Sequence, residues 1–421
     1  MRAEANGLLG KAGVKSVAEL AQQPEVRQAL TWLSVRRRWI DEKHLELCRI
    51  PAPTFQEDAR AGWMAEEFRA IGYDVSVDRA GNVIAGLRLK GSGPVVCISA
   101  HLDTVLSPAR PEEVRVDERG RFVGPGVADN GSGLAALVGV AAALSRNGVG
   151  GDGAEKIIFV ANVGEEGEGN LSGMRYLCRP SGWGRRIGWY VVVDGPSTDH
   201  VTARAVASRR FEIAISGPGG HSWSDFGIGN PVHALSRAIT LFTEDQTERL
   251  QASRNGSRLS FNFGFIEGGA SVNAIPALAR AKVDLRSEQP EEMAALAEAL
   301  RGAVEKALHI ENIRAEGAKL SARVREIGYR PGGRLPEDAP ILEYLRAVDG
   351  FLGIRSRPDS ASTDANIPLS LGRQAISIGA GGQGGGAHTR EEWYDPAGRE
   401  IGLKRIYLLA LLLARAAGAG P

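Results

Sequence analysis

The segment CISAHLDTV, residues 97–105, passes without a break from an apolar, β-branched stretch into a histidine and an aspartate. This pattern predicts a buried strand over residues 94–100 that delivers His101 to its carboxyl end. In an open α/β sheet, ligands bind in the crevice beyond the carboxyl ends of the strands. The segment therefore indicates an α/β fold with a functional site at the end of this strand.

Other segments place histidines and carboxylates in a similar way. They are GVADNGSG (126–133), FVANVGEEGEGN (159–170), YVVVDGPS (190–197) and GGGAHTREEWYD (384–395). Because strand ends meet at one edge of a sheet, their distance in sequence does not argue against a shared site. The metal-competent residues of all five segments are His101, Asp129, Glu166, Asp194 and His388, with Asp103 and Glu165 beside two of them.

The chemistry of these residues favours bound cations. A buried carboxylate is unfavourable unless it is paired, hydrogen-bonded or bound to a metal, and the adjacent Glu165 and Glu166 repel each other. Zinc accepts histidine nitrogen and carboxylate oxygen, and catalytic zinc sites keep one position open for water. Two histidines and three carboxylates suffice for two ions roughly 3.5–4 Å apart if one carboxylate bridges them. Asp129 is the candidate for that bridge.

Each residue also has a simpler interpretation. The Asp of a His-x-Asp pair often only fixes a tautomer, and a Glu-Glu pair is usually a solvated loop or the start of a helix. Asp194 after a strand is commonly a cap for the next helix, and His388 in a glycine-rich loop is compatible with a surface position. The occurrence of all five, in this order and at strand ends, favours one shared metal site.

At these residues the chain resembles the zinc-dependent aminoacylase and carboxypeptidase family of metallopeptidases. That family contains peptidase T, bacterial glutamate carboxypeptidase, acetylornithine deacetylase and succinyl-diaminopimelate desuccinylase. The resemblance extends from about residue 44 onward. It implies two zinc ions per subunit, with cobalt or manganese as alternatives for such ligands. The implied ligands are His101, Asp129 and Asp194 for one ion, and Asp129, Glu166 and His388 for the other.

The resemblance also implies roles for the two neighbours. Asp103 would orient the imidazole of His101, and Glu165 would be the general base that moves a proton from water to the leaving amine. The expected reaction is hydrolysis of an amide bond in a short peptide or N-acyl amino acid, without a covalent enzyme intermediate. Asp194 and the tract SASTDANIPLSLG (360–372) resemble the peptidase T-like branch, while an N-acyl-amino-acid deacylase is the alternative.

The hydrophobic pattern changes near residue 203. Before it we expect a helix over 25–49 and then alternating strands and helices. After it the pattern predicts the β-α-β-β-α-β order of a ferredoxin-like domain, and the chain then returns to a helix over 339–352 and a strand over 374–379. We therefore expect a discontinuous, zinc-exopeptidase-like α/β domain with a mixed sheet flanked by helices, residues 1–203 and 331–421. Residues 204–330 would form an inserted α+β domain, which the resemblance makes a lid and dimerisation domain.

The inserted region contributes further candidate residues. GPGGHSWSD (217–225) resembles the family's glycine-rich turn with a histidine, which implies that His221 stabilises the oxyanion, often in the site of a partner subunit. A surface histidine is the alternative. Asn273 and Arg286 resemble the family's substrate-binding pair, and an arginine can hold a substrate carboxylate bidentately, although an ordinary ion pair is equally compatible with Arg286. The glycine-rich loop around Gly385 offers backbone N–H groups for the same anion.

Composition bears on partners and location. The net charge of +1 is spread along the chain, which argues against nucleic acid as partner, and no apolar run is long enough to span a membrane. Three widely spaced cysteines, Cys48, Cys97 and Cys178, are typical of reduced thiols. Residues 1–40 lack the apolar core of a signal peptide, so we expect a cytoplasmic protein unless a leader has been removed.

Rival functions have weaker support. The loop GAGGQGGGAH (379–388) lacks the Lys-Ser/Thr that follows a phosphate-binding loop, and no G-x-S-x-G elbow of a serine hydrolase occurs. A non-catalytic binding or dimerisation module of the same fold would be expected to have lost a ligand or the base. All of those residues are present.

Overall fold

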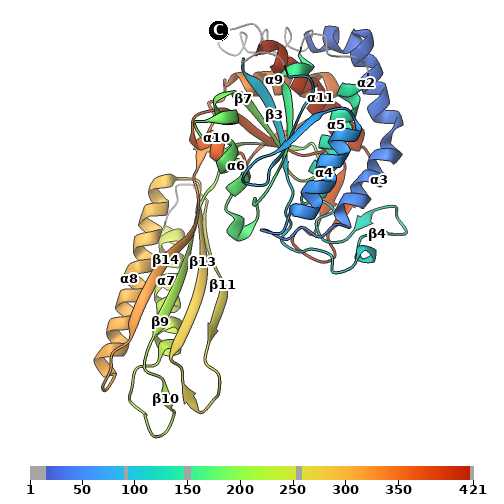
Figure 1. Cartoon of the computed structure of the whole chain (residues 1–421). Helices are drawn as coiled ribbons and strands as arrows, with labels where there is room; N and C mark the ends of the chain where they lie inside the picture. The colour runs from blue at the N-terminus through green and yellow to red at the C-terminus, as the bar shows by residue number, and fades with distance from the viewer. Residues whose placement is uncertain (1–15, 90–92, 147–152, 253–257, 418–421) are drawn as a thin grey trace. The chain divides into compact units, whose positions relative to one another are not determined.

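The computed structural model describes residues 16–89, 93–146, 153–252 and 258–417 (Figure 1). Its contacts divide the chain into two compact units. The discontinuous unit comprises Met1–Ala205 and Gly333–Pro421, and the inserted unit comprises Val206–Gly332. These divisions lie two residues beyond the boundaries expected at 203/204 and 330/331.

The discontinuous unit is built on a nine-stranded mixed sheet with the order β1-β2-β6-β3-β7-β17-β8-β15, in which β16 also pairs with β8. Its neighbours β6, β3, β7 and β17 run parallel, so their carboxyl ends lie at one edge. The bounds of the strands are β1 Asp74–Val77, β2 Val83–Gly86, β3 Val95–His101, β6 Ile157–Asn162, β7 Ile187–Val193, β8 His200–Ala205, β15 Gly333–Arg334, β16 Arg357–Ala361 and β17 Gln374–Ile378.

Helices cover both faces of this sheet, which explains why its central strands are apolar on both sides. In β3, Val96 and Ile98 face one core, whereas Val95 and Cys97 face the other. The first core is formed with α2 Pro24–Val35, α3 Arg37–Cys48, α4 Asp58–Ala70, α5 Gly131–Ser145, α9 Pro340–Leu352 and α11 Arg399–Ala416. The second is formed with α6 Ser172–Leu177 and with Ala365 and α10 Asn366–Ser370. The expected α/β class is confirmed.

The single helix expected over 25–49 is wrong, because helical geometry is interrupted at Arg36. That residue has a ψ of 18°, so α2 ends before it and α3 begins after it. Both helices contact α5, and each buries its own apolar residues. The apolar period continues through the break, which is why the sequence pattern does not reveal it.

Helix α5 lies at the centre of the unit. Its sequence, GSGLAALVGVAAALS, is apolar on every side, and all residues from Gly131 to Leu144 are buried. The Asn130 side chain caps its start by accepting a hydrogen bond from the backbone N–H of Gly133. Helix α11, near the C-terminal end, packs against α5 and is itself largely buried.

A small antiparallel sheet, not foreseen from the sequence, joins distant loops of the same unit. Its order is β18-β19-β5-β4, and its strands are only two or three residues long: β4 Arg115–Val116, β5 Phe122–Val123, β18 Gln383–Gly385 and β19 Trp393–Asp395. It ties the segment before Asp129 to the segment after His388.

The inserted unit has the ferredoxin-like order expected for it. Four antiparallel strands in the order β11-β13-β9-β14 form a sheet, and two long helices pack on one of its faces (Figure 1). The elements are β9 Ala207–Ser216, α7 Pro231–Ala252, β11 Leu259–Gly268, β13 Leu278–Ser287, α8 Pro290–Arg314 and β14 Ser321–Arg330, with a short pair β10 Gly220–His221 and β12 Ala274–Ile275. Among the helices that the structure describes, none is long and apolar enough to cross a bilayer.

Candidate metal centre

His101 ends β3, and the chain itself holds one side of its buried ring. Nδ1 lies 2.9 Å from the backbone oxygen of Asp103, so this nitrogen carries a proton that it donates. The other nitrogen, Nε2, lies 3.1 Å from Oδ1 of Asp129 and 3.7 Å from Oδ1 of Asp194. In the neutral ring, the Nε2 lone pair therefore faces a position that two carboxylates also approach.

Asp129, which precedes α5, turns its two oxygens toward different histidines. Oδ1 approaches His101, whereas Oδ2 lies 3.1 Å from Nε2 of His388. The same nitrogen of His388 lies 3.2 Å from Oε1 of Glu166. This is the arrangement expected of a carboxylate that bridges two ions.

The side chains form two donor groups that share Asp129. One contains His101, Asp129 and Asp194, the other contains Asp129, Glu166 and His388, and the ligand atoms within each group lie within 4.8 Å of one another. Two ligands that are each about 2.0–2.1 Å from a tetrahedral zinc ion lie roughly 3.3 Å apart. The N···O distances of 3.1 to 3.7 Å bracket that value, so the donor set fits two zinc-sized ions.

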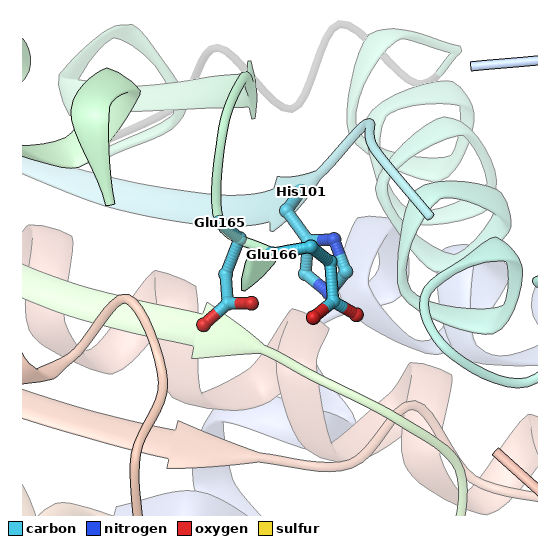
Figure 2. A group of neighbouring side chains, drawn as sticks. All are labelled: His101, Glu165 and Glu166. Atoms are coloured by element: carbon cyan, nitrogen blue, oxygen red, sulfur yellow. The ribbon is translucent and has the colours of Figure 1, made fainter. Parts of the chain in front are cut away.

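The Glu165–Glu166 pair is positioned by Asp103. Oδ1 of Asp103 accepts the backbone N–H of Glu165 at 2.9 Å, and Oδ2 accepts that of Glu166 at 2.8 Å. Figure 2 shows both glutamate side chains leaving this turn toward the same side as the imidazole of His101. The Asp103 carboxylate is 3.6 Å from Nδ1 of His101, so the closer contact to the ring comes from the Asp103 backbone. Its carboxylate mainly orders the two glutamates.

The electrostatics of the centre favour positive charge between its carboxylates. Hydrogen bonds to Asp129 and Glu166 raise the pKa of His388 to about 10. Burial alone would lower the pKa of His101, but contacts with Asp103, Asp129 and Asp194 raise it well above its usual value. Burial would raise the pKa of Asp129, yet the two histidines lower it overall. A bound metal ion would take the place of the protons on these histidines, because metal ligands must be deprotonated.

Two acidic residues that the sequence did not single out lie buried near this centre. The carboxylate of Glu392 accepts hydrogen bonds from the loop that ends at Asp129, and burial raises its pKa to about 7. Asp364 accepts a hydrogen bond from Asn162 at 2.6 Å, and burial raises its pKa to about 7 as well. In the sequence, only their positions could have identified these two acids. Glu392 follows His388 by four residues, and Asp364 lies within the tract at 360–372.

The remaining candidates divide between the units. Gly385 lies in β18 of the discontinuous unit, where a Cβ would come within 3.0 Å of the Trp393 indole. Arg286 lies on β13 of the inserted unit, and its side chain pairs with that of Asp284 at 2.6 Å. Asn273 lies beside the His221 turn, because its backbone oxygen accepts the N–H of Ser222.

The turn after His221 fixes the ring of that residue. Nδ1 of His221 accepts the backbone N–H groups of Trp223 and Ser224 at 3.2 and 3.3 Å. The Asp225 carboxylate accepts the backbone N–H of His221 at 2.6 Å. A ring whose Nδ1 accepts must carry its proton on Nε2 in the neutral form. The exposed His221 therefore presents a hydrogen-bond donor.

Comparison with known proteins places these residues in a family context. Residues 97–414 match the sequence model of peptidase family M20/M25/M40. A succinyl-diaminopimelate desuccinylase from Gluconacetobacter diazotrophicus is 24% identical over 332 residues, which cover 75% of this chain and 82% of that protein. Carboxypeptidase G2 from Pseudomonas sp. is 24% identical over 370 residues, covering 84% and 83%.

Solved structures agree on the fold. A tripeptidase from Staphylococcus aureus superposes with a TM-score of 0.69 at 19% identity, covering 90% of this chain and 99% of that chain. A dinuclear metal-binding peptidase of family M20 from Bacillus subtilis superposes with a TM-score of 0.62 at 16% identity, covering 90% and 99%.

Proposed function

Because the chain belongs to peptidase family M20/M25/M40, and so to a family of metal-dependent amide hydrolases, we propose that it is a two-zinc exopeptidase for short peptides. The observation that carries this proposal is the sharing of Asp129 between two donor groups. An N-acyl-amino-acid deacylase is the second candidate, which the similarity to a desuccinylase favours. Both candidates use the same centre and differ in the group beside the amide.

The proposed mechanism assigns one task to each residue. His101, Asp129 and Asp194 would hold one ion, and Asp129, Glu166 and His388 would hold the other. When bound, the ions would supply water of lowered pKa and polarise the scissile carbonyl. Glu165 takes a proton from the attacking water and passes it to the leaving amine. Asp103 holds the backbone of Glu165 in place while this happens.

The inserted unit supplies the remaining groups in this proposal. Nε2–H of His221 donates a hydrogen bond to the oxyanion, and the turn that fixes its Nδ1 as an acceptor supports that role. Arg286 and Asn273 hold the substrate carboxylate with the backbone at Gly385. We further propose a homodimer through the inserted unit and a cytoplasmic location, which the three free, buried cysteines support.

A substrate screen with controlled metal tests the proposal. The protein is stripped with a chelator, and zinc, cobalt or manganese is returned before di- and tripeptides and N-acyl amino acids are offered. We expect about two ions per chain and chelator-sensitive release of an amino acid, with peptides preferred. Faster cleavage of acyl amino acids would select the deacylase. Absence of any metal-dependent hydrolysis would favour a non-catalytic module.

Replacing His221 with alanine is expected to lower turnover by about 10²- to 10³-fold, because a single oxyanion donor contributes that much. Metal content should stay at the wild-type level, since His221 belongs to neither donor group. Steady-state kinetics and metal analysis of the same preparation check both points. Equal turnover in the two proteins would remove His221 from the mechanism.

Mixing variants tests whether His221 acts across a dimer. Subunits carrying His221→Ala and subunits carrying Glu165→Ala are each nearly inactive in the proposed mechanism. If His221 serves the partner, a mixed dimer regains one intact site, and activity returns on co-refolding. If it serves its own subunit, the mixture stays inactive.

A further inference from the structure

The loop before Asp129 wraps around the side chain of Glu392. Oε1 of Glu392 accepts the backbone N–H groups of Ala128 at 2.7 Å and Asp129 at 2.8 Å, and Oε2 accepts that of Gly126 at 3.2 Å. The backbone oxygen of Glu392 accepts a further N–H, that of Gly124, at 2.8 Å. Four N–H groups within six residues of the loop thus converge on Glu392, a residue that is only 2% exposed.

A carboxylate is chemically specific for this task. In the ionised form its two oxygens only accept, and together they have room for three or four donors. An amide of the same shape offers one oxygen, and its NH₂ group would meet backbone N–H groups. A buried donor left without an acceptor is strongly unfavourable. The loop conformation therefore depends on the acid at position 392.

The opposite side of the loop is held by His44 on α3. Nε2 of His44 lies 2.7 Å from the backbone oxygen of Val127, and Nδ1 accepts a hydrogen bond from Arg399 at 2.7 Å. Arg399, on α11, is anchored by Asp41 at 2.6 Å. Because Nδ1 accepts, the ring proton is on Nε2, where it meets the carbonyl of Val127. Burial and the neighbouring Arg399 charge lower the pKa of His44 well below its usual value, which keeps the ring neutral.

Glu392 is also linked to two members of one donor group, Asp129 and His388. Glu392 holds the backbone of Asp129, and Oδ2 of Asp129 lies 3.1 Å from Nε2 of His388. His388 and Glu392 belong to one tight turn, in which the N–H of Glu392 approaches the oxygen of Thr389 at 3.4 Å. Displacement of Glu392 would therefore change the distance between the Asp129 and His388 side chains.

We propose that Glu392, supported by His44, is a positioning residue that presents Asp129 to both ions and sets its spacing from His388. The inference rests on the proposed two-ion function and concerns the assembly of the same centre. Glu392 touches neither substrate nor reacting atoms in it. Its effect passes through the backbone of residues 124–129.

The substitution Glu392→Gln tests this inference, with Glu391→Gln as the matched control. Glu391 is the adjacent residue, is exposed and pairs with Arg115, so the same chemical change is made outside the loop. Affinity for Zn²⁺ and Co²⁺ is measured by competition with a chromophoric chelator, without any substrate. We expect Glu392→Gln to weaken binding of at least one ion by about 10- to 100-fold, the range found for residues that orient ligands. Glu391→Gln should match the wild type.

Two further measurements separate positioning from general stabilisation. Lost activity of Glu392→Gln should return largely in kcat as the metal concentration is raised, and Glu392→Asp should recover part of the affinity because it restores the acid. If Glu392→Gln does not fold, His44→Leu, which removes the donor to Val127, should show the same loss of metal affinity. Lower unfolding temperature with metal affinity equal to that of Glu391→Gln would overturn the inference.

The metal titration also distinguishes this inference from the proposed function. Weakened metal binding in Glu392→Gln, in a protein that cleaves no amide, would support positioning and refute the hydrolase. Metal-dependent hydrolysis with unchanged affinity in Glu392→Gln would keep the hydrolase and refute positioning.

Discussion

Replacing Glu165 with alanine is expected to abolish measurable hydrolysis, a loss of about 10²- to 10⁴-fold for removal of a general base, while both ions stay bound. The reason lies in the grouping of the side chains. Glu165 belongs to neither of the two groups that share Asp129. Its carboxylate forms a third donor group with a ring nitrogen of His101 and the carboxylate of Glu166, whose ligand atoms also lie within 4.8 Å of one another. Its backbone, held by Asp103, does not depend on its side chain.

The measurement is turnover with a saturating peptide together with metal analysis of the same sample. Glu168→Ala is the matched control, because this exposed glutamate follows in the same loop and lies outside all three donor groups. Loss of an ion from Glu165→Ala would mean that Glu165 is a ligand in the third group, with His101 and Glu166. Retained turnover would refute its role as base.

Replacing Asp129 with alanine is expected to have the broadest effect on the metal centre. Because Asp129 is the one residue common to both donor groups, its loss should reduce the metal content from about two ions per chain to fewer than one. It also leaves His101 and His388 without the oxygens that each contacts at 3.1 Å. Hydrolysis should become undetectable at any practical metal concentration.

Variants that affect only one of these two donor groups show whether Asp129 serves both ions. Of the two groups that share Asp129, Asp194→Ala affects only the one with His101, and Glu166→Ala affects only the one with His388, so each variant should lose one ion. Asp199→Ala, an exposed aspartate paired with Ser197 and His200, is the control and should keep both ions. An Asp129→Ala protein that retains two ions would disprove the bridge.

The convergence of the ligands was predictable because it follows from strand direction. Once β3, β6 and β7 are parallel neighbours, the residues that follow them must meet at one edge of the sheet. His101, Glu166 and Asp194 are such residues. Continuous apolar runs, each followed by a polar residue, are enough to predict this convergence.

The support around the ligands was not predictable from those patterns. Glu392 acquires its role from strands of two or three residues, β5 and β19, which are too short for periodicity to reveal. The closer contact of Asp103 with the His101 ring comes from a backbone oxygen, which no side-chain pattern encodes. The break between α2 and α3 at Arg36 is hidden because the apolar period continues through it.

The buried helix α5 packs against α11, which is synthesised much later. A ribosome completes α5 and four of the five metal-binding candidates before it begins the inserted unit, whereas His388 and α11 are translated after that unit. At that stage the nascent chain contains α5 but not α11, which packs against it. It contains all members of the donor group with His101, whereas the other group still lacks His388. In the proposed two-ion centre, the second group can therefore hold its ion only after the inserted unit has been synthesised.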